Sequence, residues 1–120
     1  MAFRIEKAGD FIEVQVWGSA DRSEVVQILR KLHEMTPRKE ISDLWLLSED
    51  YVVPWDAFSS IVKELRYLLS ADVIANKSAI VVTSHSKMAQ ARLYLEEAKC
   101  LPFDIGVFMT REEAVRWLKT

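Results

Sequence analysis

Residues 78–118 read SAIVVTSHSKMAQARLYLEEAKCLPFDIGVFMTREEAVRWL, and they contain two strand patterns that each lead into a helix pattern. The first six residues are rich in β-branched side chains, which predicts a buried strand. Small and apolar residues then recur at helical spacing until Leu101-Pro102, where the helix should end. A second alternating run and a second capped helix pattern complete the segment. Strands that alternate with helices need crossover connections, so this half of the chain predicts parallel pairing.

The first half of the chain predicts the rest of the sheet. Polar and apolar residues alternate on both sides of Gly9, which indicates a β-hairpin. Asp21 and Glu24 have the spacing of a capping box at the start of a helix, and Pro54 suits the first turn of another. The predicted elements are strands over 2–7, 11–17, 43–47, 78–83 and 104–109, and helices over 21–35, 54–70, 85–99 and 111–119. We therefore predict one α/β domain over residues 1–120, with a mixed five-stranded sheet, mostly parallel with one antiparallel strand from the N-terminal hairpin, and four helices.

Composition limits the classes of function. Half of the 120 residues are hydrophobic, 28% are charged, and the formal net charge is -2. This balance predicts a packed globular domain and gives no reason to expect a nucleic-acid partner. The single cysteine, Cys100, cannot form an internal disulfide, which fits a reducing compartment. Charges in the first six residues argue against a signal peptide, and no apolar run approaches the roughly 20 residues of a membrane span, so we expect a cytoplasmic protein.

The closing segment 107–118 reads VFMTREEAVRWL. A last strand that ends in Phe and runs into a capped helix with a Glu-Ala-x-x-Trp-Leu pattern resembles the SpoIIAA-like group of the STAS/SEC14-type fold. The strand AIVV at 79–82, followed by a helix with Ala91-Arg92, is similar as well. The resemblance covers nearly the whole chain in layout, while its specific residues are confined to the last dozen. It implies the same mixed sheet and four helices.

The resemblance also implies two kinds of function. Anti-sigma-factor antagonists of this fold carry a phosphorylatable serine in an Asp-Ser-Ser-Gly-type turn, where this chain reads LSEDY at 47–51. The glycine and the paired serines are missing, so Ser48 does not match the phosphorylated residue. Other relatives of the fold bind small apolar molecules or lipids between sheet and helix, which implies a ligand site in this chain.

Open parallel sheets collect ligands at the carboxyl ends of their strands, where loops and helix N-termini meet. The loop 48–53 follows one such end and has more apolar surface than a solvated connector needs. The hydroxyl-rich segment 83–86 follows the next. We predict a ligand-binding cleft formed by Tyr51, Trp55, Ser84, His85, Met88 and Phe108. Structural roles stay open for the same residues: Ser84 or Ser86 as a helix cap, His85 as an exposed side chain, and the aromatic residues as core.

No catalytic set stands out. A nucleophile would need His85 beside a serine and a carboxylate, with Asp50 or Asp104 as the candidates, and the chain has no Gly-x-Ser-x-Gly elbow. His33 and His85 lie far apart, and neither has a cysteine or carboxylate cluster at metal-ligand spacing. With three glycines, the chain has no phosphate-binding loop. We predict no catalytic residue, no metal site and no cofactor.

These patterns favour a non-enzymatic binding or interaction module that accommodates an apolar small molecule or lipid. The alternative is a regulatory protein partner of the anti-sigma-factor-antagonist type that acts without the usual phosphoserine. A hydrolase-like enzyme is the third hypothesis. Because the hairpin leaves sheet edges that need cover, we also predict a homodimer.

Overall fold

The computed structural model describes residues 2–19, 21–36, 41–52, 57–68, 76–101 and 103–120. Its strands and helices are β1 (Ala2–Ala8), β2 (Phe11–Trp17), α1 (Arg22–Met35), β3 (Ser42–Leu47), α2 (Ala57–Leu68), β4 (Lys77–Val81), α3 (His85–Glu97), β5 (Asp104–Phe108) and α4 (Arg111–Leu118), with a 3-10 turn (Ala98–Cys100) after α3. The order matches the predicted one, although the predicted ends of the helix over 54–70 lie outside the described residues. Within the described part of the chain, no helix combines the length and apolar character needed to cross a membrane.

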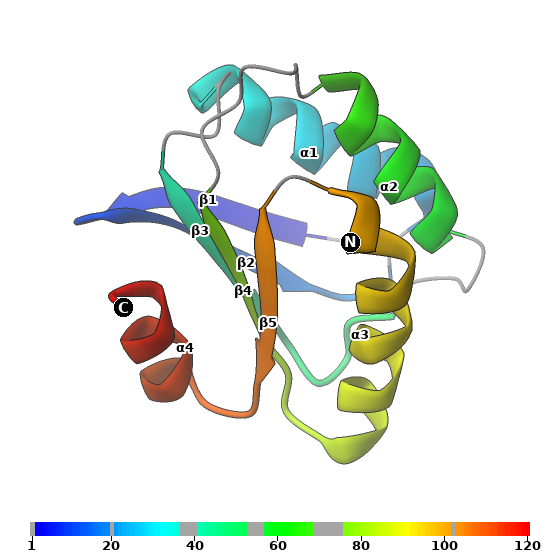
Figure 1. The fold of residues 1–120 in the computed structure, drawn as a ribbon. Helices are drawn as coiled ribbons and strands as arrows, with labels where there is room; N and C mark the ends of the chain where they lie inside the picture. The colour runs from blue at the N-terminus through cyan, green and yellow to red at the C-terminus, as the bar shows by residue number, and fades with distance from the viewer. Residues whose placement is uncertain (1, 20, 37–40, 53–56, 69–75, 102) are drawn as a thin grey trace.

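The five strands lie in the sheet in the order in which they follow along the chain, β1-β2-β3-β4-β5 (Figure 1). β1 pairs with β2 in antiparallel fashion, and each later pair is parallel. The hairpin turn holds Gly9 at a φ of 65°, a left-handed conformation that residues with a Cβ rarely adopt. The predicted fold class is therefore confirmed.

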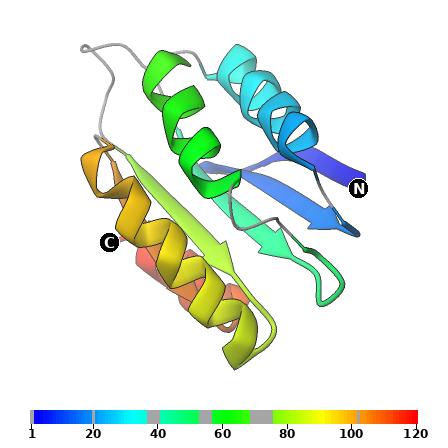
Figure 2. The ribbon, with the colours of Figure 1, turned by 90° about the vertical axis from the view of Figure 1, so that its right-hand side faces the viewer.

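Three of the helices cover one face of the sheet, and α4 covers the other (Figure 2). Each crossover from β2 to β5 moves one strand further in the same direction. Crossovers of one hand then place α1, α2 and α3 on the same side, which we call the three-helix face. An ion pair of 2.8 Å between Arg30 Nε and Glu64 Oε1 links α1 to α2.

The core under the three helices follows from the alternation of side chains along each strand. Val14 of β2 and Ile28 of α1 are both fully buried in one cluster. Val82, just after β4, and Ala91 of α3 belong to a second cluster. Tyr94 of α3 packs against both and against a third cluster at the end of α3, so this side chain lies at the centre of the face.

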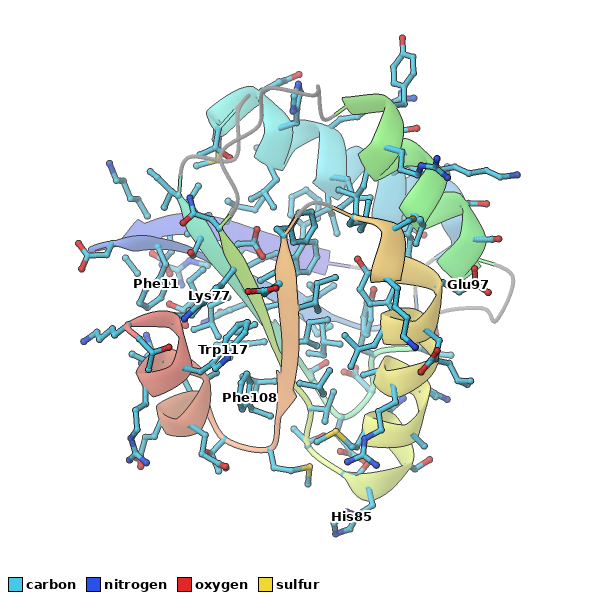
Figure 3. All side chains as sticks on the ribbon, in the orientation of Figure 1. Phe11, Lys77, His85, Glu97, Phe108 and Trp117 are labelled. Atoms are coloured by element: carbon cyan, nitrogen blue, oxygen red, sulfur yellow. The ribbon has the colours of Figure 1, made fainter. Side chains whose placement is uncertain are left out.

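The opposite face carries a smaller core beneath α4. Leu44 and Ala79 are fully buried there. The ring of Trp117 lies 5.4 Å from that of Phe108, tilted by 48°, where α4 crosses β5 (Figure 3). Lys77 Nζ lies 5.1 Å from the Trp117 ring and donates to the Trp117 carbonyl oxygen at 2.9 Å, which fastens the end of α4 to β4.

Capping side chains begin three of the helices as their sequence patterns indicate. Asp21 and Glu24 form both bonds of the predicted box, at 2.9 and 3.2 Å. Ser84, and not Ser86, caps α3. Thr110 caps α4 by accepting from the amide three residues later. Each bond satisfies a main-chain donor that a helix start leaves without a partner.

Candidate functional site

A cavity of about 150 Å³ lies between the three-helix face of the sheet and the helices above it. Most of its wall is apolar. Leu29 of α1, Ile61 of α2 and Ala91 of α3 line it from above, and Trp45 and Ile80 line it from the sheet. Because every element on this face contributes, the cavity exists only once the three helices have packed on the strands.

The cavity runs along β3 and β4 from the carboxyl ends of these strands to their amino ends. Leu47 and Val82 line it at the carboxyl ends, and Asp43 and Ser78 line it at the amino ends. The chain enters α3 at the carboxyl end of the sheet and leaves α1 at the amino end. The two ends of the cavity therefore have different neighbours and different chemistry.

At the carboxyl end, Tyr51 lines the cavity from the loop after β3. Its side chain is 7% exposed and belongs to the core cluster. Lys87 Nζ donates to the Tyr51 carbonyl oxygen at 2.5 Å, which ties this loop to α3. Burial raises the pKa of the Tyr51 phenol, so the phenol stays protonated at neutral pH. A hydrogen bond from the Ser48 hydroxyl is the main cause of a lowered pKa at Asp50, and the charge of Lys87 contributes to it.

At the amino end, a buried polar cluster interrupts the apolar wall. Asp43 is 7% exposed, and its Oδ1 accepts a hydrogen bond from the Ser78 hydroxyl and another from Trp45 Nε1 at 2.9 Å. Burial, with the charge of Asp43 as a second cause, raises the pKa of the Tyr94 phenol. Two donors to one carboxylate oxygen offset the cost of burying it.

His33 lines the same end of the cavity from the last turn of α1. Its Nδ1 is buried, and no described residue forms a hydrogen bond with that nitrogen. Most buried polar atoms in folded proteins have a partner, because leaving one without a bond costs about 1–3 kcal/mol. The His33 nitrogen is therefore a position at which a molecule in the cavity would gain a hydrogen bond.

Of the six residues predicted to form a cleft, the structure brings two to this region. Tyr51 lines the cavity. Met88 of α3 is half-buried and packs against the cluster that contains Val82 and Ala91. Trp55 lies outside the described residues.

The other three lie apart from the cavity lining. Ser84 accepts a hydrogen bond from the Lys87 amide at 3.2 Å as the cap of α3. His85 is exposed and points away from the body of the protein (Figure 3). Phe108 packs on the opposite face with Trp117, so the sheet separates it from Tyr51.

Sequence reasoning missed the polar end of the cavity. Asp43 stands at the start of an apolar strand run, two residues before Trp45, so both side chains point to the same buried face. A charged residue in such a position is a signal of a buried polar contact. Its partner Ser78 is 35 residues away, and His33 comes from a helix, so only packing could reveal that they share a cavity.

The described residues contain no group of three His, Cys, Asp or Glu side chains that could hold a metal ion. Ser78 donates directly to Asp43, so its proton is directed to a carboxylate and not to an imidazole. Cys100 is exposed at the end of the 3-10 turn. The arrangement is suited to holding a small molecule by packing and a few hydrogen bonds.

Comparisons of the sequence with family models and with curated proteins find no match. A comparison of structures finds an uncharacterized protein from the DUF3478 family of Shewanella loihica PV-4, which has a SpoIIAA-like fold. The two chains are 18% identical and superpose with a TM-score of 0.63 over 98% of this chain and 92% of the other. The fold of this protein is therefore SpoIIAA-like, as the closing strand and helix predicted.

Proposed function

We propose that this protein is a non-enzymatic binding module that takes a small apolar molecule into the cavity between the sheet and helices α1, α2 and α3. The observation that carries the proposal is the cavity itself, about 150 Å³ in volume and mostly apolar. Packed cores seldom leave a space larger than a water molecule, because an empty cavity lowers stability. A ligand that fills this cavity would offset that cost.

Three features of the chain support binding over catalysis. Asp43 and Ser78, two of the hydrogen-bonding residues that line the cavity, are already joined to each other. The wall comes from three helices and the sheet, which suits enclosure of an apolar body. The lining includes Tyr51, which belongs to the predicted cleft. We further propose that the protein acts in the cytoplasm, in keeping with its composition and its single cysteine.

The test is to fill the cavity and measure binding of toluene. Ala91 is buried on α3 and lines the cavity, so Ala91→Leu should occupy the space and remove binding. Ala89 is exposed on the same helix, and Ala89→Leu makes the same chemical change outside the cavity. Titration calorimetry and the ligand-induced rise in melting temperature should show binding in the parent protein and in Ala89→Leu, but not in Ala91→Leu.

Each outcome decides the proposal. Toluene binding that persists in a folded Ala91→Leu protein would locate the ligand elsewhere, and no binding by the parent protein would overturn the proposal directly. If Ala91→Leu does not fold, Ala91→Met fills the same space with a more flexible side chain and repeats the test.

A further inference from the structure

We infer that the ligand of this cavity is a small neutral molecule with an apolar body and one hydroxyl group, and that the hydroxyl hydrogen-bonds to Nδ1 of His33. The inference rests on the proposed function, because it assigns the chemical class of the molecule that the cavity takes. It concerns the amino end of β3 and β4, opposite to the strand ends at which the sequence predicted a site.

The volume limits the size of the body. A cavity of about 150 Å³ in an engineered protein core stays dry and binds benzene. The cavity here has the same volume, so its occupant is about the size of one aromatic ring with a small substituent. The buried body of the ligand is therefore about as large as one aromatic ring.

The hydrogen-bonding positions decide where the polar group goes. His33 Nδ1 is buried, and within the described part of the chain nothing bonds to it. A neutral imidazole carries a donor at one nitrogen and an acceptor at the other. A hydroxyl group both donates and accepts, so it completes the bonding of Nδ1 in either tautomer. A purely apolar ligand would leave this nitrogen without a partner.

The charges at the two ends exclude an anionic head group. Asp43 lines the amino end, and a ligand carboxylate there would face another carboxylate at low local polarity. Lys87 lines the carboxyl end, where its ammonium group donates to the Tyr51 carbonyl at 2.5 Å. That ammonium group is therefore already engaged by a main-chain oxygen of the protein. A neutral ligand avoids both problems.

Three ligands with the same methylphenyl body test the inference: toluene, 4-methylphenol and 4-methylbenzoate. Toluene is the most apolar, so burial alone makes it the tightest ligand. A hydrogen bond between the ligand hydroxyl and His33 Nδ1 should reverse this order of affinities. We therefore expect 4-methylphenol to bind at least about tenfold more tightly than toluene. The ¹⁵N chemical shift of the His33 ring should move when 4-methylphenol binds and should respond much less to toluene.

His33→Phe keeps a ring of similar size and removes both nitrogens, so it should abolish the preference for 4-methylphenol while toluene still binds. His33→Asn places an amide near the Nδ1 position and should restore part of the preference. If His33→Phe does not fold, His33→Leu also removes both nitrogens and repeats the test. His85→Phe removes the exposed histidine that the sequence analysis placed in a cleft at the other strand ends. A loss of the preference in His85→Phe, with none in His33→Phe, would overturn the inference in favour of that cleft.

The possible results separate the two proposals. Equal affinity for toluene and 4-methylphenol would leave the proposed function intact and refute the inference about His33. Tightest binding of 4-methylbenzoate would refute the inference and point to Lys87. Absence of binding for all three ligands would refute the proposed function itself. A preference for 4-methylphenol that depends on His33 supports both.

Discussion

The buried hydrogen bond between Ser78 and Asp43 should contribute measurably to the free energy of unfolding, and a double-mutant cycle can detect that contribution. Ser78→Ala removes one of the two donors to Asp43 Oδ1 that the structure describes, Trp45 Nε1 being the other. Removing a partner of a buried carboxylate costs about 2 kcal/mol of the free energy of unfolding. Asp43→Leu leaves the buried Ser78 hydroxyl and the partly buried Trp45 Nε1 without this acceptor, so it should lower the free energy of unfolding by about 3 kcal/mol.

The combined variant is the informative measurement. If the two changes were independent, the double variant would lose about 5 kcal/mol. Because both single changes break the same bond, we expect the double variant to lose only about 3 kcal/mol, since mainly the Trp45 donor then lacks its acceptor. Urea unfolding followed by circular dichroism measures all four proteins, and an unchanged slope shows that the unfolded state is the same.

Ser86→Ala is the matched control for the serine substitution, because Ser86 is exposed. Its stability should stay within about 0.5 kcal/mol of the parent protein. The reasoning would be refuted if Ser78→Ala cost no more than this control, or if the losses from Ser78→Ala and Asp43→Leu were simply additive. Should Asp43→Leu fail to fold, Asp43→Asn completes the cycle with a smaller change.

Four further predictions concern the fold and assembly. Lys77→Met should lower the free energy of unfolding by about 2 kcal/mol, because Lys77 Nζ donates to main-chain oxygens at the end of α4 at 2.9 Å. Lys119 is exposed, so Lys119→Met should leave the stability almost unchanged. Equal losses for the two variants in urea unfolding would contradict this role of Lys77. Gly106→Ala would place a Cβ 2.9 Å from two ring atoms of Phe108, so it should lower the free energy of unfolding by about 1–3 kcal/mol. An unchanged stability would mean that the Phe108 ring moves aside freely. Ser84→Ala should lower stability by about 1 kcal/mol through loss of the α3 cap, and an unchanged denaturation midpoint would show that the cap is not needed. We also predict a homodimer, and a monomer mass in light scattering across micromolar concentrations would disprove it.

Much of the fold was predictable because it depends on local patterns. The alternation around Gly9 predicted the hairpin, and the structure pairs β1 with β2 over seven residues on each side. The box of Asp21 and Glu24 predicted where α1 begins. Strand ends were less predictable: the strand predicted over 78–83 ends at Val81, where its ladder with β5 ends at Phe108.

The candidate site was predicted less well, because a cavity depends on several elements at once. Tyr51 reached the cavity from the loop after β3, as its apolar neighbourhood suggested. Phe108 did not, because alternation along β5 points it to the face that α4 covers. His85 follows the cap of α3 and faces solvent, so its place beside hydroxyl groups in the sequence carried no information about a pocket.

The sequence by itself determined the class of fold, since the alternation of side chains, the helical spacing and the capping residues act over a few neighbouring positions. It also excluded a strongly basic surface and a disulfide framework, because those are matters of composition. The tertiary structure alone decided which face each helix covers, and it brought Asp43, Ser78 and His33 to one end of one cavity. These three residues lie on β3, β4 and α1, and contacts between separate elements depend on how the layers pack together, which no local pattern records.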